Sequence, residues 1–256
     1  MAEKKPLLSP GSILGPLREL RRASRDVRPL VVSGAPAAAA ELHRALAEGG
    51  DAGAVRDGPP HGAAALVYVL AGAPDGADVH ALREASLAGV PIVAVATDPA
   101  TSIPYVLATD VVAAGPGAVD EVARVLARRL GERAAGLAAR LPVLREAVSE
   151  RLVASFARKN AIVGAAVFIP GADMPVMTVN QMRLVMRLAA AHGLDPEPAR
   201  ALELAGVLGG GFGLRYLGRS LLGLVPVAGF AVRAAVGYAG TMAVGQAATR
   251  YYAARE

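Results

Sequence analysis

The sequence predicts an α/β domain with a short parallel sheet, followed by an all-α domain of helical hairpins. Between residues 27 and 131, apolar runs alternate with helical patterns. These runs are continuously apolar, which is typical of parallel strands covered on both faces. After residue 160 the strand-like runs stop, and apolar helical patterns are interrupted by turns that contain proline and glycine.

The α/β domain is expected to contain four clear strands and one weak edge strand. The clear strands are RPLVVSG (28–34), GAAALVYVLAG (62–72), PIVAVATD (91–98) and the shorter DVVAAG (110–115), and the weak one is AGAVRDG (52–58). Helical patterns follow at PAAAAELHRALAEGG (36–50), at DGADVHALREASLAGV (75–90), which ends at Gly89, and at AVDEVARVLARRLG (118–131), which ends at Gly131. Regular alternation of strand and helix predicts that the strands run in one direction.

Two further segments flank this domain. Residues 1–26 are predicted to form a disordered or surface-lying tail. They begin with a basic head, and three prolines interrupt the apolar stretch that follows. Residues 132–160 are predicted to form an amphipathic linker helix, which Pro142 kinks or restarts. Its apolar stripe, at spacings of three and four, consists of Leu137, Leu141, Leu144, Val148, Leu152 and Phe156.

Charge is unevenly distributed along the 256 residues, whose net charge is +5. Residues 151–256 hold 11 basic and 5 acidic side chains, whereas residues 1–150 hold 16 and 17. Basic charge thus accompanies the most apolar part of the chain, which favours an anionic membrane surface as a partner. Nucleic acid is not expected, because basic clusters with stacking aromatic residues are missing. With no cysteine and four isolated histidines, no metal site is expected.

Residues 161–256 are predicted to form a helical, membrane-associating domain. Pro170 and Pro226 mark the turns of two hairpins. Arg233 is the only charge between Ser220 and Thr249, and it divides that segment into uncharged runs of 13 and 16 residues. Both are shorter than the roughly 18 to 20 residues of a spanning helix. A buried soluble core, an interfacial or re-entrant hairpin, and two tight spans all remain open.

Three polar residues of this segment are candidates for a structural or a membrane role. Asp173 lies between two prolines, where it can cap a helix, pair with an arginine or hold a ligand. Gln181 can hydrogen-bond across helices. Arg233 can pair with an acidic side chain or reach lipid phosphates.

The stretch VVSGAPAAAAELHRAL (31–46) has the layout of a phosphate-binding loop without its chemistry. On the pattern G-x-x-x-x-G-K-[ST], Gly34 takes the first position, and Ala39, Ala40 and Glu41 replace the second glycine, the lysine and the hydroxyl residue. The phosphate-neutralising lysine is therefore absent, and a carboxylate stands where the metal and phosphates would meet.

Residues 64–99, AALVYVLAGAPDGADVHALREASLAGVPIVAVATDP, are similar to an Era-type small GTPase. Its guanine motif N-K-x-D falls on residues 95–98, where only Asp98 survives, and its D-x-x-G motif is absent. The resemblance implies a degenerate GTPase-like domain that does not hydrolyse GTP, with Gly34 and Asp98 as vestigial nucleotide-binding residues and no cofactor. An unrelated flavodoxin-like fold is the alternative.

The second half resembles the YcjF-type family, also called domain of unknown function 697. The matching positions are Pro170, Asp173, Gln181, Met182, Gly193, Pro226, Gly229, Thr241, Gly245, Tyr251 and Tyr252. The resemblance covers residues 150–256. It implies membrane association and a place after an Era-like GTPase domain, and it brings no catalytic residues.

The sequence therefore predicts a non-catalytic, membrane-associated scaffold or regulator with a pseudo-GTPase domain. No catalytic set is found, since Ser33, Ser220 and Asp110 lack a suitably placed histidine. The expected location is the cytoplasmic side of the cytoplasmic membrane, with the cytoplasm as the alternative, and the expected partner is a GTPase or a membrane protein. A divergent GTP-binding protein or GTPase and a pore-forming or effector protein are the alternative functions. The oligomeric state is left open.

Overall fold

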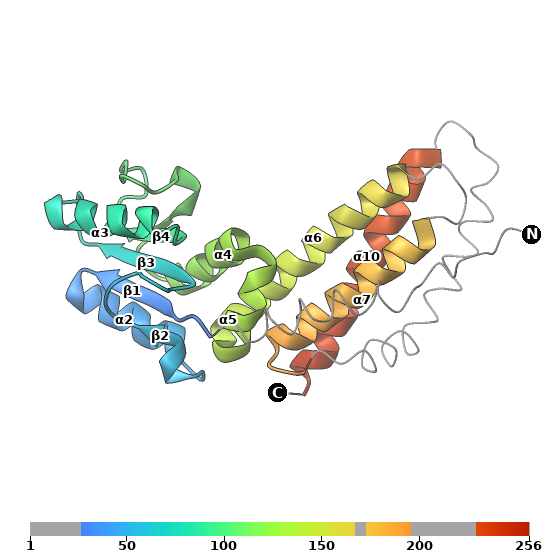
Figure 1. Cartoon of the computed structure of the whole chain (residues 1–256), viewed down its shortest axis with the longest axis horizontal. Coiled ribbons are helices and arrows are strands. Elements are labelled where there is room, and N and C mark those ends of the chain that lie inside the picture. Colours follow the sequence, from blue (N-terminus) through green and yellow to red (C-terminus); the bar gives the residue numbers. More distant parts are fainter. Residues whose placement is uncertain (1–26, 167–172, 196–228, 256) are drawn as a thin grey trace, which may run out of the picture. The chain divides into compact units, whose positions relative to one another are not determined.

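The computed structural model describes residues 27–166, 173–195 and 229–255 (Figure 1), with side chains at all of them except 173–175. Contacts divide these residues into two units: an α/β unit that ends at Arg151, and a helical unit that begins at Leu152. Pro170, Pro226 and the tail over 1–26 lie outside the described residues.

The α/β unit alternates strands and helices along the chain. Its strands are β1 (Leu30–Gly34), β2 (Val55–Arg56), β3 (Ala65–Leu70), β4 (Ile92–Ala96) and β5 (Val111–Ala113). Its helices are α2 (Pro36–Ala47), α3 (Gly76–Leu87), α4 (Ala118–Leu130) and α5 (Ala134–Arg140), followed by the start of α6 (Arg145–Ala166). All four clear strands, the weak edge strand and the three helices expected between 27 and 131 are confirmed, with ends that differ by a few residues.

The five strands form one fully parallel sheet in the order β2-β1-β3-β4-β5. The prediction of a parallel sheet is therefore confirmed. Strand β1 lies between β2 and β3, so β3 is added on the side of β1 away from β2 and the chain changes its winding direction between β1 and β3. Ligands of doubly wound sheets bind at such a switch point, outside the carboxyl ends of the strands.

Helices cover both faces of the sheet. Figure 1 shows α2 and α3 on opposite sides of strands β1 and β3. On the α3 side, Leu82 and Ala85 of this helix pack on alternate residues of the strands, among them Leu66 and Ile92. Helices α2 and α4 contact each other and the opposite face of the sheet. Two-sided coverage explains why β3 and β4 are buried at every position.

The predicted linker helix over 132–160 is corrected in its extent. The chain leaves α5 at Arg140, passes through a single 3-10 turn at Pro142–Leu144, and restarts as α6. Pro142 has no N–H to continue α5, which explains the restart. Helix α6 then continues to Ala166, across the expected boundary at 160, because no helix-breaking proline occurs before Pro170. Every residue of the predicted apolar stripe is buried.

The described helices of the second unit are the rest of α6, α7 (Asp173–Ala191) and α10 (Gly229–Ala253). Helices α7 and α10 run parallel, since Gln181 contacts Thr241 and His192 contacts Tyr252, an offset of 60 at both points. Helix α6 runs antiparallel to α10, since Gly164 faces Arg233 and Asn160 faces Gly237. The end of α6 and the starts of α7 and α10 therefore lie at one end of the unit, as Figure 1 also shows.

Candidate functional site

The predicted phosphate-binding position lies at the switch point, at the carboxyl end of β1. Gly34 has a φ of +110°, and a Cβ built on it would lie 2.1 Å from the carbonyl oxygen of Val69 in β3. The next amide, at Ala35, donates a 2.8 Å hydrogen bond to that same carbonyl. Gly34 is therefore needed for the close approach of the two strands.

The corner between β1 and α2 contains one residue. Strand β1 ends at Gly34 and helix α2 begins at Pro36, so only Ala35 lies between them. Residues 39–41, which take the later positions of the phosphate-loop pattern, form the second turn of α2, and Ala39 is 7% exposed. A phosphate loop needs an open run of backbone amides between its two glycines, and here that run is helical.

Asp98, the second predicted nucleotide-binding residue, forms hydrogen bonds within its own loop after β4. One carboxylate oxygen accepts a 2.9 Å hydrogen bond from the Ala100 amide, and the other accepts a 3.3 Å bond from the Thr101 hydroxyl. These contacts close a local turn of a kind that aspartate commonly forms. The structure thus places Gly34 and Asp98 at the ends of different strands. Gly34 permits the close approach of two strands, and Asp98 stabilises its own turn.

The corner between β3 and α3 is acidic. Asp75 and Asp78 form a capping box at the start of α3, in which each side chain accepts a hydrogen bond from the backbone of this turn. Buried Tyr68 donates a 2.8 Å hydrogen bond to Asp78. Burial raises the pKa of the Tyr68 hydroxyl, and the hydrogen bond to Asp78 raises it further. Two carboxylates next to the switch point disfavour a bound phosphate.

A shallow depression lies beside the exposed face of α2, with a volume of about 780 Å³. His43 Nδ1 is 3.0 Å from Asp57 Oδ1 at its rim. A histidine paired with a carboxylate is part of many catalytic sets, but a nucleophile is also required. The lining carries no serine, threonine or cysteine; it consists of Ala40, Glu41, His43, Arg44, Ala45, Ala47, Glu48 and Asp57.

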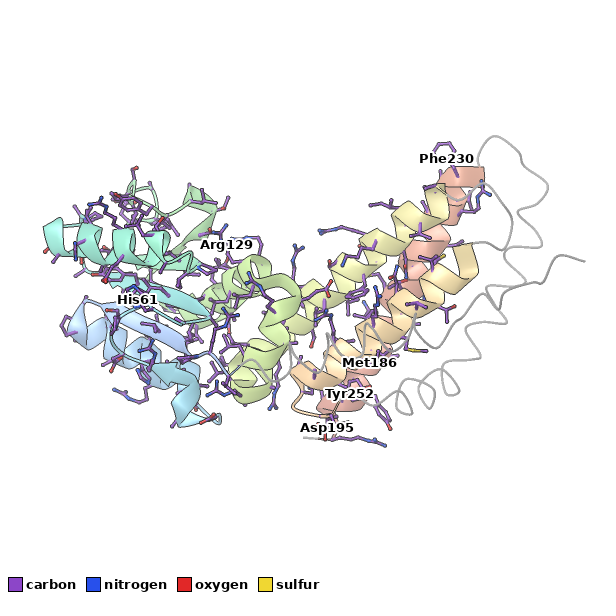
Figure 2. All side chains as sticks on the ribbon, viewed as in Figure 1. His61, Arg129, Met186, Asp195, Phe230 and Tyr252 are labelled. Carbon is purple, nitrogen blue, oxygen red and sulfur yellow. The ribbon has the colours of Figure 1, made fainter. Side chains whose placement is uncertain are left out.

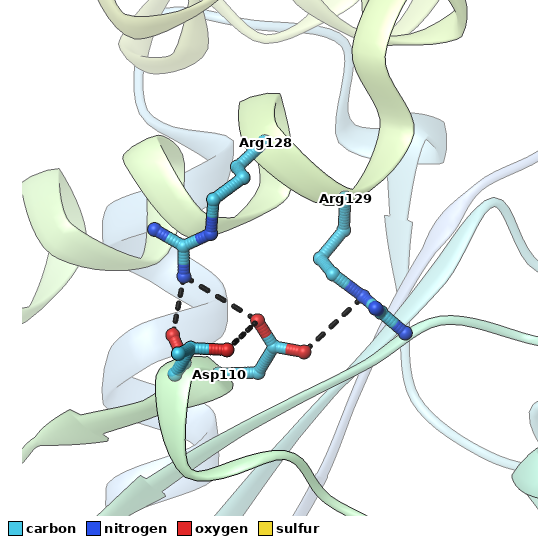
Figure 3. Close-up of polar contacts among 4 residues, drawn as sticks. Asp110, Arg128 and Arg129 are labelled. Carbon is cyan, nitrogen blue, oxygen red and sulfur yellow. Dashed lines mark hydrogen bonds and ion pairs between the residues drawn. The ribbon is translucent and has the colours of Figure 1, made fainter.

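A buried carboxylate, which the sequence suggested only as a rejected catalytic candidate, connects the start of β5 to α4 (Figure 3). Asp110 is 1% exposed. Arg128 Nη2 donates a 3.3 Å hydrogen bond to Asp110 Oδ1 and also bonds the carbonyl of Thr109, and Arg129 Nε lies 3.2 Å from Asp110 Oδ2. Two consecutive arginines at the end of a helix were the only sequence signal for this cluster.

The helical unit contains a buried amide cluster, formed by Asn160, Asn180, Gln181 and Thr241. Asn160 Nδ2 donates to Thr241 Oγ1 over 2.8 Å, and Gln181 Nε2 donates to the same oxygen over 3.3 Å. The Thr241 hydroxyl donates to the Gly237 carbonyl, and Asn180 Nδ2 donates to Asn160 Oδ1. The expectation that Gln181 hydrogen-bonds across helices is confirmed, whereas Asn160 and Asn180 were missed.

Small residues surround this cluster. A Cβ at Gly237 would lie 2.7 Å from the carbonyl oxygen of Asn160, and a Cβ at Gly164 would lie 2.7 Å from that of Arg233. A Cβ at Gly245 would meet Val153 at 2.5 Å. Close helix contacts through glycine, joined by amide and hydroxyl bonds, are common where helices pack in or near lipid, but they also occur in soluble helical cores.

The remaining predicted residues have separate places. Asp173 is the first residue of α7, and Arg233 is a partly exposed residue of the first turn and a half of α10. At the far end of the unit, buried Tyr252 packs on His192 with ring centroids 6.0 Å apart (Figure 2). Thus, of the predicted membrane or turn residues, only Gln181 belongs to the amide cluster.

No protein-family model matches this chain, and neither a curated protein nor a solved structure gives a significant match. Within residues 27–166, 173–195 and 229–255, none of the helices combines the length and apolarity needed to cross a bilayer. The same residues hold no group of three or more metal-ligating side chains.

Proposed function

We propose that this chain is a non-catalytic scaffold or regulator at the cytoplasmic face of the cytoplasmic membrane. In this proposal the α/β unit contacts a protein partner, such as a GTPase or a membrane protein, and the helical unit associates with the membrane. The observation that carries the proposal is the closed corner at Gly34. One residue joins strand β1 to helix α2, and the carbonyl oxygen of Val69 fills the space beside Gly34.

The strand order supports a finer assignment of the α/β unit. The order 2-1-3-4-5 is that of flavodoxin-like doubly wound sheets. We therefore infer a flavodoxin-like or GTPase-like architecture that is kept as a rigid platform while its ligand-binding corner is closed. Acidic residues at the β3–α3 corner support the same view, because they repel a nucleotide phosphate.

Charge supports the membrane part of the proposal. The described residues from 152 onward carry seven basic side chains and two acidic ones. A positive surface of this kind is attracted to a leaflet that contains anionic lipid. We infer that the helical unit belongs to an all-α domain of helical hairpins and lies on or in the membrane interface.

Two measurements on the full chain test the proposal. Titration with a fluorescent guanine nucleotide and Mg²⁺ is expected to give no saturable binding up to about millimolar concentrations, the weak limit of specific affinity. Flotation with anionic vesicles is expected to carry the protein to the top of a gradient at low salt. Saturable nucleotide binding would favour a divergent GTP-binding protein, and failure to float would remove the membrane role.

A further inference from the structure

Large apolar side chains are exposed at one end of the helical unit, where α6 ends and α7 and α10 begin. Ile162 is 67% exposed, Val176 is 48% exposed and Phe230 is 58% exposed. They come from three different helices, and we call them the apolar tip. Figure 2 shows Phe230 at the extreme end of α10.

The helix register places these residues at neighbouring levels. Gly164 of α6 faces Arg233 of α10, and Gly237 faces both Asn160 of α6 and Met177 of α7. Ile162 and Val176 therefore lie level with residues 235 and 236 of α10, where Val236 is itself exposed. Phe230 lies about 9 Å further toward the end, at about 1.5 Å per residue. One end of the unit is thus apolar on all three helices.

Basic side chains stand close behind Phe230, the outermost residue of the apolar tip. Arg233 is about one turn after Phe230 on α10, level with Gly164 of α6. Arg158 and Lys159 are exposed on α6, about one helical turn before Ile162. Asp173 is the only acidic residue among 156–166, 173–182 and 229–241. This end of the helical unit therefore combines protruding apolar groups with positive charge that begins about 5 Å behind Phe230 and continues behind Ile162 and Val176.

We propose that the apolar tip inserts into the headgroup region of a bilayer that contains anionic phospholipid, with Phe230 deepest and with Arg233, Lys159 and Arg158 in contact with lipid phosphates. Interfacial protein segments bury apolar side chains about 5–10 Å deep while basic side chains contact anionic lipid. Along the helix axes, Arg233 lies about 5 Å and Lys159 about 12 Å behind Phe230, and these two distances bracket that depth. Shallow insertion also fits described helices that are too short or too polar to cross a membrane.

This proposal rests on the membrane association proposed above, and it adds the surface that makes the contact. The chain contains no tryptophan, so a single introduced tryptophan reports its own surroundings. Phe230→Trp is placed at the apolar tip, and Leu87→Trp is the matched control, because Leu87 is 77% exposed on α3 of the α/β unit. Both full-length variants are titrated with vesicles of phosphatidylcholine and phosphatidylglycerol, and with phosphatidylcholine alone.

The emission of Phe230→Trp is expected to shift to shorter wavelength and to be quenched by brominated lipid only with the anionic vesicles. Leu87→Trp is expected to show neither effect. In flotation, Ile162→Ser combined with Phe230→Ser is expected to lower the partition coefficient by about tenfold or more, from the loss of two apolar insertions. Leu87→Ser is expected to leave it unchanged.

The outcomes separate this proposal from the one on which it rests. If wild-type protein floats but Phe230→Trp shows no spectral shift, the apolar tip is not the contact surface, and membrane association stands. If wild-type protein does not float, both proposals are wrong. If the serine variants float normally but melt at lower temperature than Leu87→Ser, the tip is covered by another part of this chain, and insertion is excluded.

Discussion

Asn160 and Thr241 are joined by a 2.8 Å hydrogen bond between Asn160 Nδ2 and Thr241 Oγ1, although they are 81 positions apart in the sequence. Both side chains are fully buried. The bond connects α6 to α10, and Gln181 extends the connection to α7. This polar contact fixes the register of three helices whose apolar surfaces alone would allow sliding.

Replacing the central hydroxyl is expected to destabilise the helical unit strongly. Thr241→Val keeps the shape of the side chain but leaves the amides of Asn160 and Gln181 without their acceptor. Unsatisfied buried donors cost about 1–3 kcal/mol each, so we expect a loss of about 2–4 kcal/mol in the free energy of unfolding, measured by chemical denaturation.

The matched control for this variant is Thr249→Val, also on α10. The Thr249 hydroxyl donates a 3.0 Å hydrogen bond to the carbonyl of Gly245 within its own helix, and it is only partly buried. We expect a loss of less than about 1 kcal/mol. Equal losses from the two threonine variants would contradict a special role for the amide cluster.

The close approach at Gly34 makes a second prediction. Gly34→Ala places a methyl group 2.1 Å from the carbonyl oxygen of Val69, at a φ that side chains rarely adopt. We expect a loss of more than about 3 kcal/mol, or failure to fold, because neither backbone can move without disrupting the sheet. Gly72→Ala is the control, since nothing lies within 4 Å of its added Cβ. A stable Gly34→Ala variant would show that the β1–β3 contact is adjustable.

The Asp110 cluster makes a third prediction: removing its carboxylate should destabilise the protein less than removing its two arginines. Asp110→Asn leaves Arg128 and Arg129, whose side chains are 44% and 38% exposed and can turn to solvent. We expect a loss of about 1–2 kcal/mol, discounted for that exposure. Replacing both arginines with glutamine leaves a buried carboxylate without its counter-charges, and we expect a larger loss of about 2–4 kcal/mol. Thermal or urea unfolding of the wild type and of these two variants measures the difference, and the reverse order would contradict this account.

A fourth prediction concerns acid stability. The backbone amide of Gly53, followed by the side chain of Arg140, holds the pKa of Asp51 below its usual value of 3.8. A lowered carboxyl pKa adds stability that is complete above pH 3.8 and is lost as the pH falls through the pKa of the folded state. Asp51→Asn keeps an acceptor for Gly53 but removes the charge. The variant should therefore be less stable than wild type at pH 7, and this difference should close below about pH 3.8.

Arg140→Gln serves as the comparison for this pH dependence. It removes the 3.0 Å pair with Asp51 and also the 2.9 Å bond from Arg140 to the carbonyl of Val27. Part of its stability deficit should therefore persist in acid. A deficit of Asp51→Asn that stays constant from pH 7 to pH 3 would show that the charge of Asp51 does not contribute.

Local sequence patterns were sufficient to predict the strands of the sheet, but they were insufficient to predict the side-chain clusters. Val67 and Val93 are buried on the two neighbouring strands β3 and β4, and continuous apolar runs predict such strands without knowledge of their neighbours. The C-terminal end of α6 was harder to predict, because the hydropathy of the sequence changes at residue 160 while the backbone stays helical. A helix continues until a residue such as proline interrupts it, and the next proline is Pro170.

The polar clusters could not be predicted, because their members are distant in sequence. Gln181 was identified as a cross-helix donor, yet its acceptor Thr241 lies 60 positions away and was not assigned. Asp110 and Arg128 are 18 positions apart on different elements. Helical or strand periodicity predicts which face a residue occupies, but pairing between faces is determined only by the packed fold.

The single residue between β1 and α2 also limits how this chain can change. Glycine, lysine and serine placed at positions 39–41 would alter the second turn of a helix and would not form a phosphate-binding loop. Phosphate binding at this corner therefore requires additional residues between β1 and α2 as well as substitutions. Point mutations alone cannot supply that chain length, so variants that keep the one-residue corner are confined to functions that do not need a phosphate-binding loop.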